Sequence, residues 1–277
     1  MIHKQTNKKI ARRAFLKACA VLAAAGGLTA CSKTKAAGEK LPQITVGSDT
    51  YPPYIYLSND GVPTGIDVEI ATEAFRRMGY TARFEAIAWE QKKTLVESGA
   101  IDCIWGCFSM QGREEQYRWA GPYMVSRQVV AVDAASDINT LADLAGKTVM
   151  VQTTSKPEEI LLSGTDPRIP QLAEVLSTEI RSVQYAMLNC GYVDAIAAHE
   201  TAILQYMQDC NASFRILEEP LLVTGLGVAF AKNDKRGLDT RLNEVLAQMY
   251  ADGTLEQIVG AYLENAAQYL EVDGIGT

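Results

Sequence analysis

Apolar and polar positions alternate along the chain in two rhythms, one typical of strands and one of helices. The clearest element is the stretch 67–78, where apolar side chains recur every three or four positions, which predicts a helix with one buried face. We expect Asp67 to cap its start and Gly79 to end it, and we expect its apolar face to pack against a sheet.

Shorter apolar runs on both sides of this helix predict strands. The expected order up to residue 105 is strand 44–47, helix 67–78, strand 80–87, helix 90–98 and strand 101–105. Strands and helices that alternate at this spacing predict an α/β lobe with a parallel sheet.

The pattern starts again after residue 128 and predicts a second α/β lobe. The expected strands of this lobe are 129–132, 148–152 and 195–198, and its expected helices are 141–147, one opened by 153–159, 182–188 and 200–208. After this lobe, a further strand is expected at 225–231 and further helices at 239–250 and 255–263. The chain is longer than most single domains, which also favours two lobes.

The first thirty residues are typical of an export signal, with a basic start, an apolar run at 18–28 and small residues before Cys31. About a dozen apolar residues are too few to span a bilayer. Residues 28–31 resemble a bacterial lipobox, whose cysteine is acylated after cleavage, and residues 12–17 resemble a twin-arginine export motif. We therefore expect a signal at 1–30, lipid on Cys31 and a flexible tether at 31–40.

The charge balance disfavours nucleic acid as a partner. The chain carries a formal net charge of −7, and removal of the signal, which has basic but no acidic residues, makes it more negative. We expect a soluble protein held at the membrane by lipid alone. Cys103 and Cys107 are expected as small buried residues without a metal. The sequence allows a disulfide between Cys190 and Cys210 but does not require it.

Six short segments occur in a fixed order after the signal. They are 65–70, 101–104, Arg113 with 119–123, 144–149, 193–195 and 249–254. In this order they resemble the amino-acid-type solute-binding proteins of ABC transporters, known as family 3. One departure is Phe75, which stands where the family has a small residue.

The resemblance implies a two-lobe, periplasmic-binding-protein-like (type II) α/β fold with a ligand cleft between the lobes. Lobe 1 would consist of residues 41–128 and 224–277, and lobe 2 of residues 129–223. The ligand would hold the lobes closed.

The same resemblance assigns part of the ligand site to lobe 1. Arg113 matches the arginine that holds a ligand carboxylate, because its planar fork can donate two parallel charge-assisted hydrogen bonds. Without the resemblance, a surface ion pair with a neighbouring glutamate would explain it. Tyr51 and Trp89 match aromatic residues that stack on the ligand, and Cys107 and Ser109 follow the third strand at the cleft.

Two further aromatic residues in lobe 1, Trp105 and Phe108, are expected either in the cleft or in the core.

In lobe 2, Thr154 and Ser155 lie at a helix start whose free N–H groups would suit a carboxylate. The next residue, Lys156, departs from the family; it would either add a cation at the pocket or, by default, point to solvent. The family commonly has aspartate at the position of His199, where it accepts hydrogen bonds from a ligand ammonium group. A neutral imidazole can accept only one such bond. Glu200 would take over that role if the backbone is shifted; otherwise His199 recognises another group or only begins a helix.

The sequence therefore predicts a lipid-tethered, monomeric receptor that captures an amino acid or a related small polar solute and presents it to an ABC permease. It predicts no cofactor and no catalytic residue. The alternatives are an enzyme on the same fold, similar to dehydratases, and a ligand sensor for a signalling partner.

Overall fold

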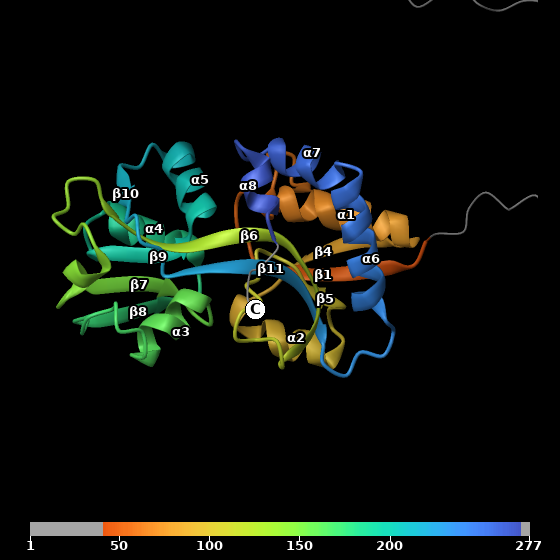
Figure 1. The fold of residues 1–277 in the computed structure, drawn as a ribbon, viewed down its shortest axis with the longest axis horizontal. Coiled ribbons are helices and arrows are strands. Elements are labelled where there is room, and N and C mark those ends of the chain that lie inside the picture. Colours follow the sequence, from red (N-terminus) through yellow and green to blue (C-terminus); the bar gives the residue numbers. More distant parts are fainter. Residues whose placement is uncertain (1–40, 273–277) are drawn as a thin grey trace, which may run out of the picture. The chain divides into compact units, whose positions relative to one another are not determined.

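A nine-stranded mixed sheet runs through residues 41–272, the part of the chain that the computed structural model describes (Figure 1). Its order is β4-β1-β5-β11-β6-β9-β7-β8, with β10 paired to β6. The strands of this sheet are β1 (Gln43–Ser48), β4 (Thr81–Ala86), β5 (Cys103–Ile104), β6 (Tyr117–Asp133), β7 (Thr148–Gln152), β8 (Glu174–Thr178), β9 (Ala195–His199), β10 (Phe214–Ile216) and β11 (Leu222–Ala231). A separate pair is formed by β2 (Tyr56–Leu57) and β3 (Pro63–Thr64).

Helices follow most strands of the large sheet, as the alternating pattern predicted. The α-helices are α1 (Ile66–Met78), α2 (Lys92–Ser98), α3 (Lys156–Ser163), α4 (Arg181–Asn189), α5 (Glu200–Cys210), α6 (Leu238–Ala251), α7 (Thr254–Gly260) and α8 (Ala266–Leu270), and the 3-10 turns are η1 (Trp89–Gln91) and η2 (Leu141–Leu144).

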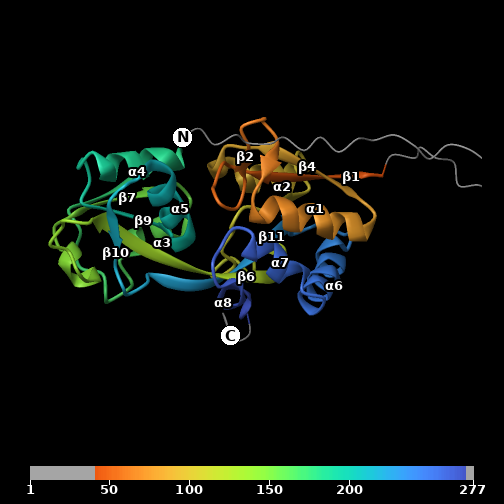
Figure 2. The same ribbon diagram turned by 90° about the horizontal axis from the view of Figure 1, so that it is seen from above.

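The sheet has two parallel ends joined by a long antiparallel pair. At one end β4, β1 and β5 are parallel, and at the other β9, β7 and β8 are parallel. Between them, β6 pairs antiparallel with β11 from Tyr117 to Gln128 and then with β9 from Gln128 to Val132. Each end has its own buried apolar clusters, and Figure 2 shows α1 and α6 beside one end and α4 and α5 beside the other. This is the two-lobe α/β fold that the sequence predicted.

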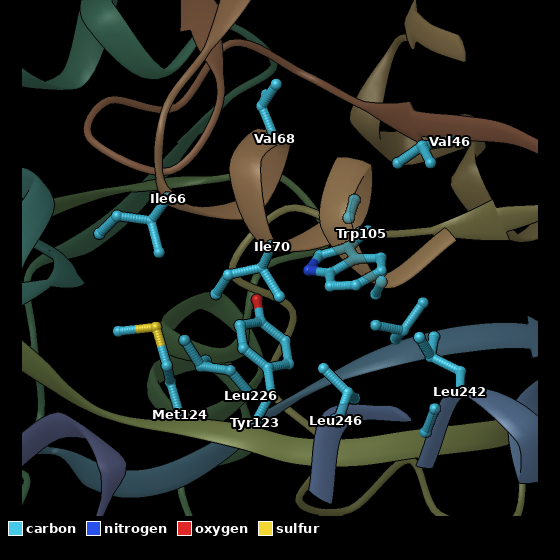
Figure 3. Packing of buried hydrophobic residues seen from close by; sticks show 14 of the residues in the cluster. Val46, Ile66, Val68, Ile70, Trp105, Tyr123, Met124, Leu226, Leu242 and Leu246 are labelled. Atoms are coloured by element: carbon cyan, nitrogen blue, oxygen red, sulfur yellow. The ribbon is translucent and has the colours of Figure 1, made fainter. Parts of the chain in front are cut away.

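The apolar face of α1 is buried as its periodicity predicted. Figure 3 shows side chains of α1, β6, β11 and α6 gathered around Trp105 and Tyr123. Phe75 lies edge-on to Trp105, with ring centroids 5.8 Å apart, so the large residue of the family signature fills the core. Trp105 is fully buried in this cluster and does not belong to a cleft.

The prediction for the helix start was wrong. Gly65, with a φ of 118°, is the N-cap, and no side chain caps α1. Asp67 lies one residue into the helix and is turned into the core, where its carboxylate accepts hydrogen bonds from the Cys107 N–H (2.7 Å) and the Tyr123 hydroxyl (2.8 Å). The expected end is confirmed, because Gly79 adopts the left-handed conformation and its N–H donates to a carbonyl of the last turn.

Several other boundaries differ from the prediction. The expected strand 101–105 is reduced to the two residues of β5, and the expected helix 141–147 is the single 3-10 turn η2, closed by a capping box between Thr140 and Asp143. The first twelve residues of β6 were not predicted as strand, because a Gly-Pro pair interrupts the apolar pattern there. The strands β2, β3, β8 and β10 and the helix α8 were not predicted either.

The cysteines of the described residues are all free. Cys103 and Cys107 are buried, as expected, whereas Cys190 and Cys210 are exposed and do not form the disulfide that the sequence left open. The predicted signal, the lipidated Cys31 and the tether lie outside the described residues. Between residues 41 and 272, no helix combines the length and the hydropathy needed to cross a membrane.

Candidate functional site

A pocket lies where the two lobes meet. Eight of the nine residues predicted for the ligand site line it, five from the lobe around β1 and three from the lobe around β7. They are Tyr51, Trp89, Cys107, Ser109, Arg113, Thr154, Ser155 and His199. Phe108 also lines the pocket, and its ring meets the Trp89 ring edge-on at 5.3 Å between centroids.

Arg113 is buried beside the pocket rather than paired with a glutamate at the surface. Its Nη1 donates to the Ser109 carbonyl at 3.2 Å, and its Nη2 donates to the Thr154 carbonyl of the opposite lobe at 3.5 Å. Its guanidinium also lies over the Phe108 ring, 5.1 Å from the centroid. Burial lowers the pKa of Arg113 from its usual value, and the carboxylate of Glu159, 3.8 Å away, partly opposes this effect.

The start of α3 differs from the expected anion site with free N–H groups. The Thr154 N–H donates to the Glu158 carboxylate at 2.5 Å, and the Ser155 N–H donates to the Gln152 carbonyl at 3.2 Å. The Ser155 hydroxyl accepts from the Glu158 N–H and therefore caps the helix. Thr154 and Ser155 line the pocket, but their N–H groups are bonded within the protein.

Lys156 does not point to solvent, so the default prediction for this residue was wrong. It lines the pocket, is buried, and pairs with Glu159 at 2.6 Å. Proline at the next position suits the first turn of α3, where its missing N–H leaves no hydrogen bond unmade.

Both ring nitrogens of His199 are in contact with uncharged side chains of β6. Nδ1 lies 2.7 Å from the Ser126 hydroxyl, and Nε2 lies 2.7 Å from the Gln128 amide nitrogen. Burial, and then the charge of Arg181, lower the pKa of His199 to about 3, so the imidazole is neutral. The backbone N–H of His199 donates to the Tyr51 hydroxyl at 3.2 Å.

Glu200 is the one predicted site residue that the structure keeps out of the pocket. It begins α5 directly after β9, so its side chain leaves the strand end on a different side from that of His199. Its carboxylate accepts a hydrogen bond from Arg127 at 2.8 Å. The backbone shift that would bring it to the position of the missing aspartate does not occur.

Arg181 is a pocket residue that sequence reasoning missed. It begins α4, and its guanidinium carbon lies 3.4 Å from the centroid of the Tyr51 ring. Its Nε donates to the Asp49 carboxylate at 2.9 Å, and the same carboxylate oxygen accepts from the Gln152 amide at 2.7 Å. One signal was present, since Asp49 follows the carboxyl end of β1, where ligand-binding loops of α/β sheets lie.

Lys92 was also missed, and it lies immediately behind the pocket wall. Its amine is buried, lies 4.7 Å from the centroid of the Trp89 ring, and donates to the Thr154 hydroxyl at 2.8 Å. Burial, and then the charge of Arg113, lower its pKa to about 7. An amine with this pKa responds to any negative charge brought into the pocket.

The pocket is equipped to hold a polar anion. Its groups are cations, amides, hydroxyls and aromatic rings. Burial raises the pKa of the Cys107 thiol, so the thiol is not ionised, and the pKa of about 3 makes the neutral imidazole of His199 a weak base; neither side chain is poised as a nucleophile or general base.

Comparisons with known proteins agree with this description. Residues 44–265 match the family described as bacterial extracellular solute-binding proteins, family 3. The glutamate-binding protein GluB of Corynebacterium glutamicum is 28% identical over 273 residues, which cover 90% of this chain and 91% of that protein. The L-cystine-binding protein TcyJ of Escherichia coli is 27% identical over 212 residues, which cover 76% and 77% of the two chains.

Solved structures show the same fold. An ancestral arginine-binding protein bound to arginine has a TM-score of 0.72 and 25% sequence identity, and covers 81% of this chain and 100% of its own. The named relatives are binding proteins. This chain belongs to the bacterial extracellular solute-binding proteins, family 3.

Proposed function

We propose that this protein captures an amino acid or a related small polar solute in the pocket between its lobes and delivers it to the permease of an ABC transporter. The observation that carries the proposal is the buried Arg113, whose guanidinium lies at a pocket lined by both lobes. A buried guanidinium is suited to bind a carboxylate through its fork. The relatives GluB and TcyJ, named for glutamate and L-cystine binding, support a solute of this class.

The two lobes are held together around the pocket by direct contacts. The Tyr54 hydroxyl lies 2.6 Å from the Thr201 hydroxyl, and the Lys92 amine reaches across to Thr154. Asp49 adds an ion pair with Arg181. In our proposal lobe 1 comprises residues 41–128 and 224–277, lobe 2 comprises residues 129–223, and the solute enters when these contacts open.

The proposal also covers the location of the protein in the cell envelope. The lipobox-like residues before Cys31 and the polar stretch 31–40 support a lipid anchor at the outer face of the cytoplasmic membrane, after removal of residues 1–30. Mass spectrometry of the protein from its native membrane would test this. A diacylated Cys31 at the mature N-terminus is the expected result, and an unmodified N-terminus elsewhere contradicts it.

Trp89 lines the pocket and provides an intrinsic probe of binding. We expect the tryptophan fluorescence of the purified protein to change saturably when the right member of a panel of amino acids and amino-acid-derived acids is added. The solute should be recovered unchanged, and cells that lack the gene should lose its uptake. A folded protein that responds to no member of the panel would contradict the proposed function.

A further inference from the structure

The charged side chains that line the pocket are all basic. Arg113, Lys156 and Arg181 line it, and none of the lining residues among those described is an aspartate or a glutamate. Lys156 has its partner in Glu159 at 2.6 Å, and Arg181 has its partner in Asp49 at 2.9 Å.

Among the described residues, two buried cations have no carboxylate within hydrogen-bond distance, and Arg113 forms only a long ion pair with Glu159. Arg113 is 3.8 Å from Glu159, whose half-exposed side chain lies closer to Lys156. Lys92 donates to the Trp89 carbonyl, the Thr154 carbonyl and the Thr154 hydroxyl, which are uncharged. Burying a cation without a counter-charge costs free energy, so an anion in the pocket would be stabilised by both groups.

The position that would hold an ammonium group offers no negative charge. His199 is uncharged, and both of its ring nitrogens are occupied by Ser126 and Gln128. The amide oxygens of Gln128 and Gln152 and both amide atoms of Gln184 have no hydrogen-bond partner in the described structure. These uncharged groups suit hydroxyl, carbonyl or amide groups of a solute.

Arg181 also changes what the Tyr51 ring can contact. Its guanidinium carbon is 3.4 Å from the ring centroid, so the protein's own cation occupies the aromatic face that could otherwise stack on a cationic solute. Its second nitrogen, Nη2, lies 3.4 Å from Asp49, at the limit of a hydrogen bond. Arg181 is therefore placed to receive a second acid group of the solute.

From these observations we infer that the pocket selects a solute with two acid groups and recognises it without an ammonium group. One acid group binds at Arg113 with support from Lys92, and the other binds beside Arg181. This inference rests on the proposed function and makes Arg181 a specificity-determining residue.

A neighbouring pocket supplies the competing possibility. It shares Tyr51, Trp89 and Arg181 with the first pocket, but its lining also includes Glu90 and Glu179. A solute with a cationic end could extend toward these acids. Binding of arginine is therefore the result that would favour this second arrangement.

The experiment compares four solutes on the wild-type protein by calorimetry at pH 7: 2-oxoglutarate, L-glutamate, L-glutamine and L-arginine. The first two have the same carbon skeleton and two carboxylates, and only glutamate has an ammonium group. We expect 2-oxoglutarate to bind at least as tightly as glutamate, and both to bind at least tenfold more tightly than glutamine, because glutamine lacks one of the two charge-assisted contacts.

Other outcomes overturn the inference in distinguishable ways. Tighter binding of glutamate than of 2-oxoglutarate would show that an ammonium group is recognised, and equal or tighter binding of glutamine or arginine would show that a second acid group is not. In each case the proposed function would stand. If none of these solutes and no other amino acid or dicarboxylate binds, both the inference and the proposed function fail.

A pair of variants tests the role of Arg181. Arg181→Met should reduce the preference for 2-oxoglutarate over glutamine by tenfold or more, while Arg181→Lys, which keeps the charge and the fold-supporting pair with Asp49, should retain part of it. Arg168→Met, which removes an arginine paired with Asp166 outside the pocket, is the control. An unchanged preference in folded Arg181→Met contradicts the assignment.

Discussion

Arg181 and Tyr51, 130 positions apart in the sequence, are in van der Waals contact, with the guanidinium carbon of Arg181 3.4 Å from the centroid of the Tyr51 ring. The contact joins α4 of one lobe to the loop after β1 of the other. Asp49 fixes the guanidinium in this position through its carboxylate. Cation–π and ionic contacts of this kind stabilise most when they are shielded from water, and here the Arg181 and Asp49 side chains are only 10% and 14% exposed.

Asp49→Asn should loosen the association of the lobes. The substitution removes the negative charge beside Arg181 and weakens the bond to the Gln152 amide, each a charge-assisted contact of roughly 1.5–3 kcal/mol. We expect weaker solute binding, by at least tenfold, together with a lower melting temperature. Calorimetry and thermal unfolding measure both. Asp166→Asn, which alters an ion pair outside the pocket, is the matched control, and equal effects of the two substitutions would contradict a role for Asp49 in closure.

Arg113→Ala should abolish binding of carboxylate solutes without unfolding the protein. The guanidinium contacts two backbone carbonyls and the Phe108 ring, so its loss removes the fork that would hold the carboxylate and leaves the core intact. We expect at least a hundredfold loss of affinity by fluorescence titration, with an unchanged circular dichroism spectrum. Retained affinity in the folded variant would show that the carboxylate binds elsewhere.

Lys92 should make solute binding depend on pH. With its pKa lowered to about 7, the amine is partly deprotonated in the free protein, and an anion in the pocket favours its protonated form. Binding should therefore take up a proton, and affinity should fall as the pH rises from 7 to 9. Calorimetry in two buffers with different ionisation enthalpies measures the uptake. Lys92→Met should remove it, and equal proton uptake by the variant would contradict the assignment to Lys92.

Asp67 should make the protein less stable as the pH rises from about 4 to about 7. Burial raises the pKa of its carboxyl to about 7, so the folded protein keeps a proton that the unfolded chain releases near its ordinary pKa. Above pH 7 folding must bury the charge, and below pH 4 the carboxyl is protonated in both states. We expect this group to lower the free energy of unfolding by roughly 2–4 kcal/mol between pH 4 and 8.

Urea denaturation of the wild type and of Asp67→Asn at pH 5 and 8 measures this effect, and the variant should show the smaller decrease. Glu73→Gln is the control. Contacts with Arg76 and Arg77 lower the pKa of Glu73 to about 2, so its stabilisation is complete above about pH 4.5 and disappears only below that. A similar decrease in the wild type and in Asp67→Asn would contradict the role of Asp67.

Regular local patterns were the part of the fold that the sequence predicted best. The strand 148–152 coincides with β7, and the helix around 67–78 differs from α1 by one residue at its start. The first part of β6 was missed because a Gly-Pro pair interrupts its apolar pattern, and its pairing with β11, about a hundred residues away in the sequence, could not be read from either segment alone.

The residues of the site, too, were predicted only where a local sequence pattern identified them. Arg113 was predicted because a spacing of six residues to Trp119 connects it with a known pattern. Arg181 was not, since an arginine at the start of a helix looks like an ordinary surface residue until the Tyr51 ring is placed above it. The positions of Glu200 and Lys156 depended on the direction of single side chains, which helical or strand periodicity does not determine.

His199 contacts Ser126 and Gln128, which both lie on β6, the strand shared by the two lobes. Gln128 is the residue at which β6 passes from its pairing with β11 to its pairing with β9. In the proposed opening of the lobes, we expect this crossing point to move less than Arg113 and Arg181, which lie on different lobes. The imidazole and its two partners would then present uncharged groups to a solute before the two arginines approach it.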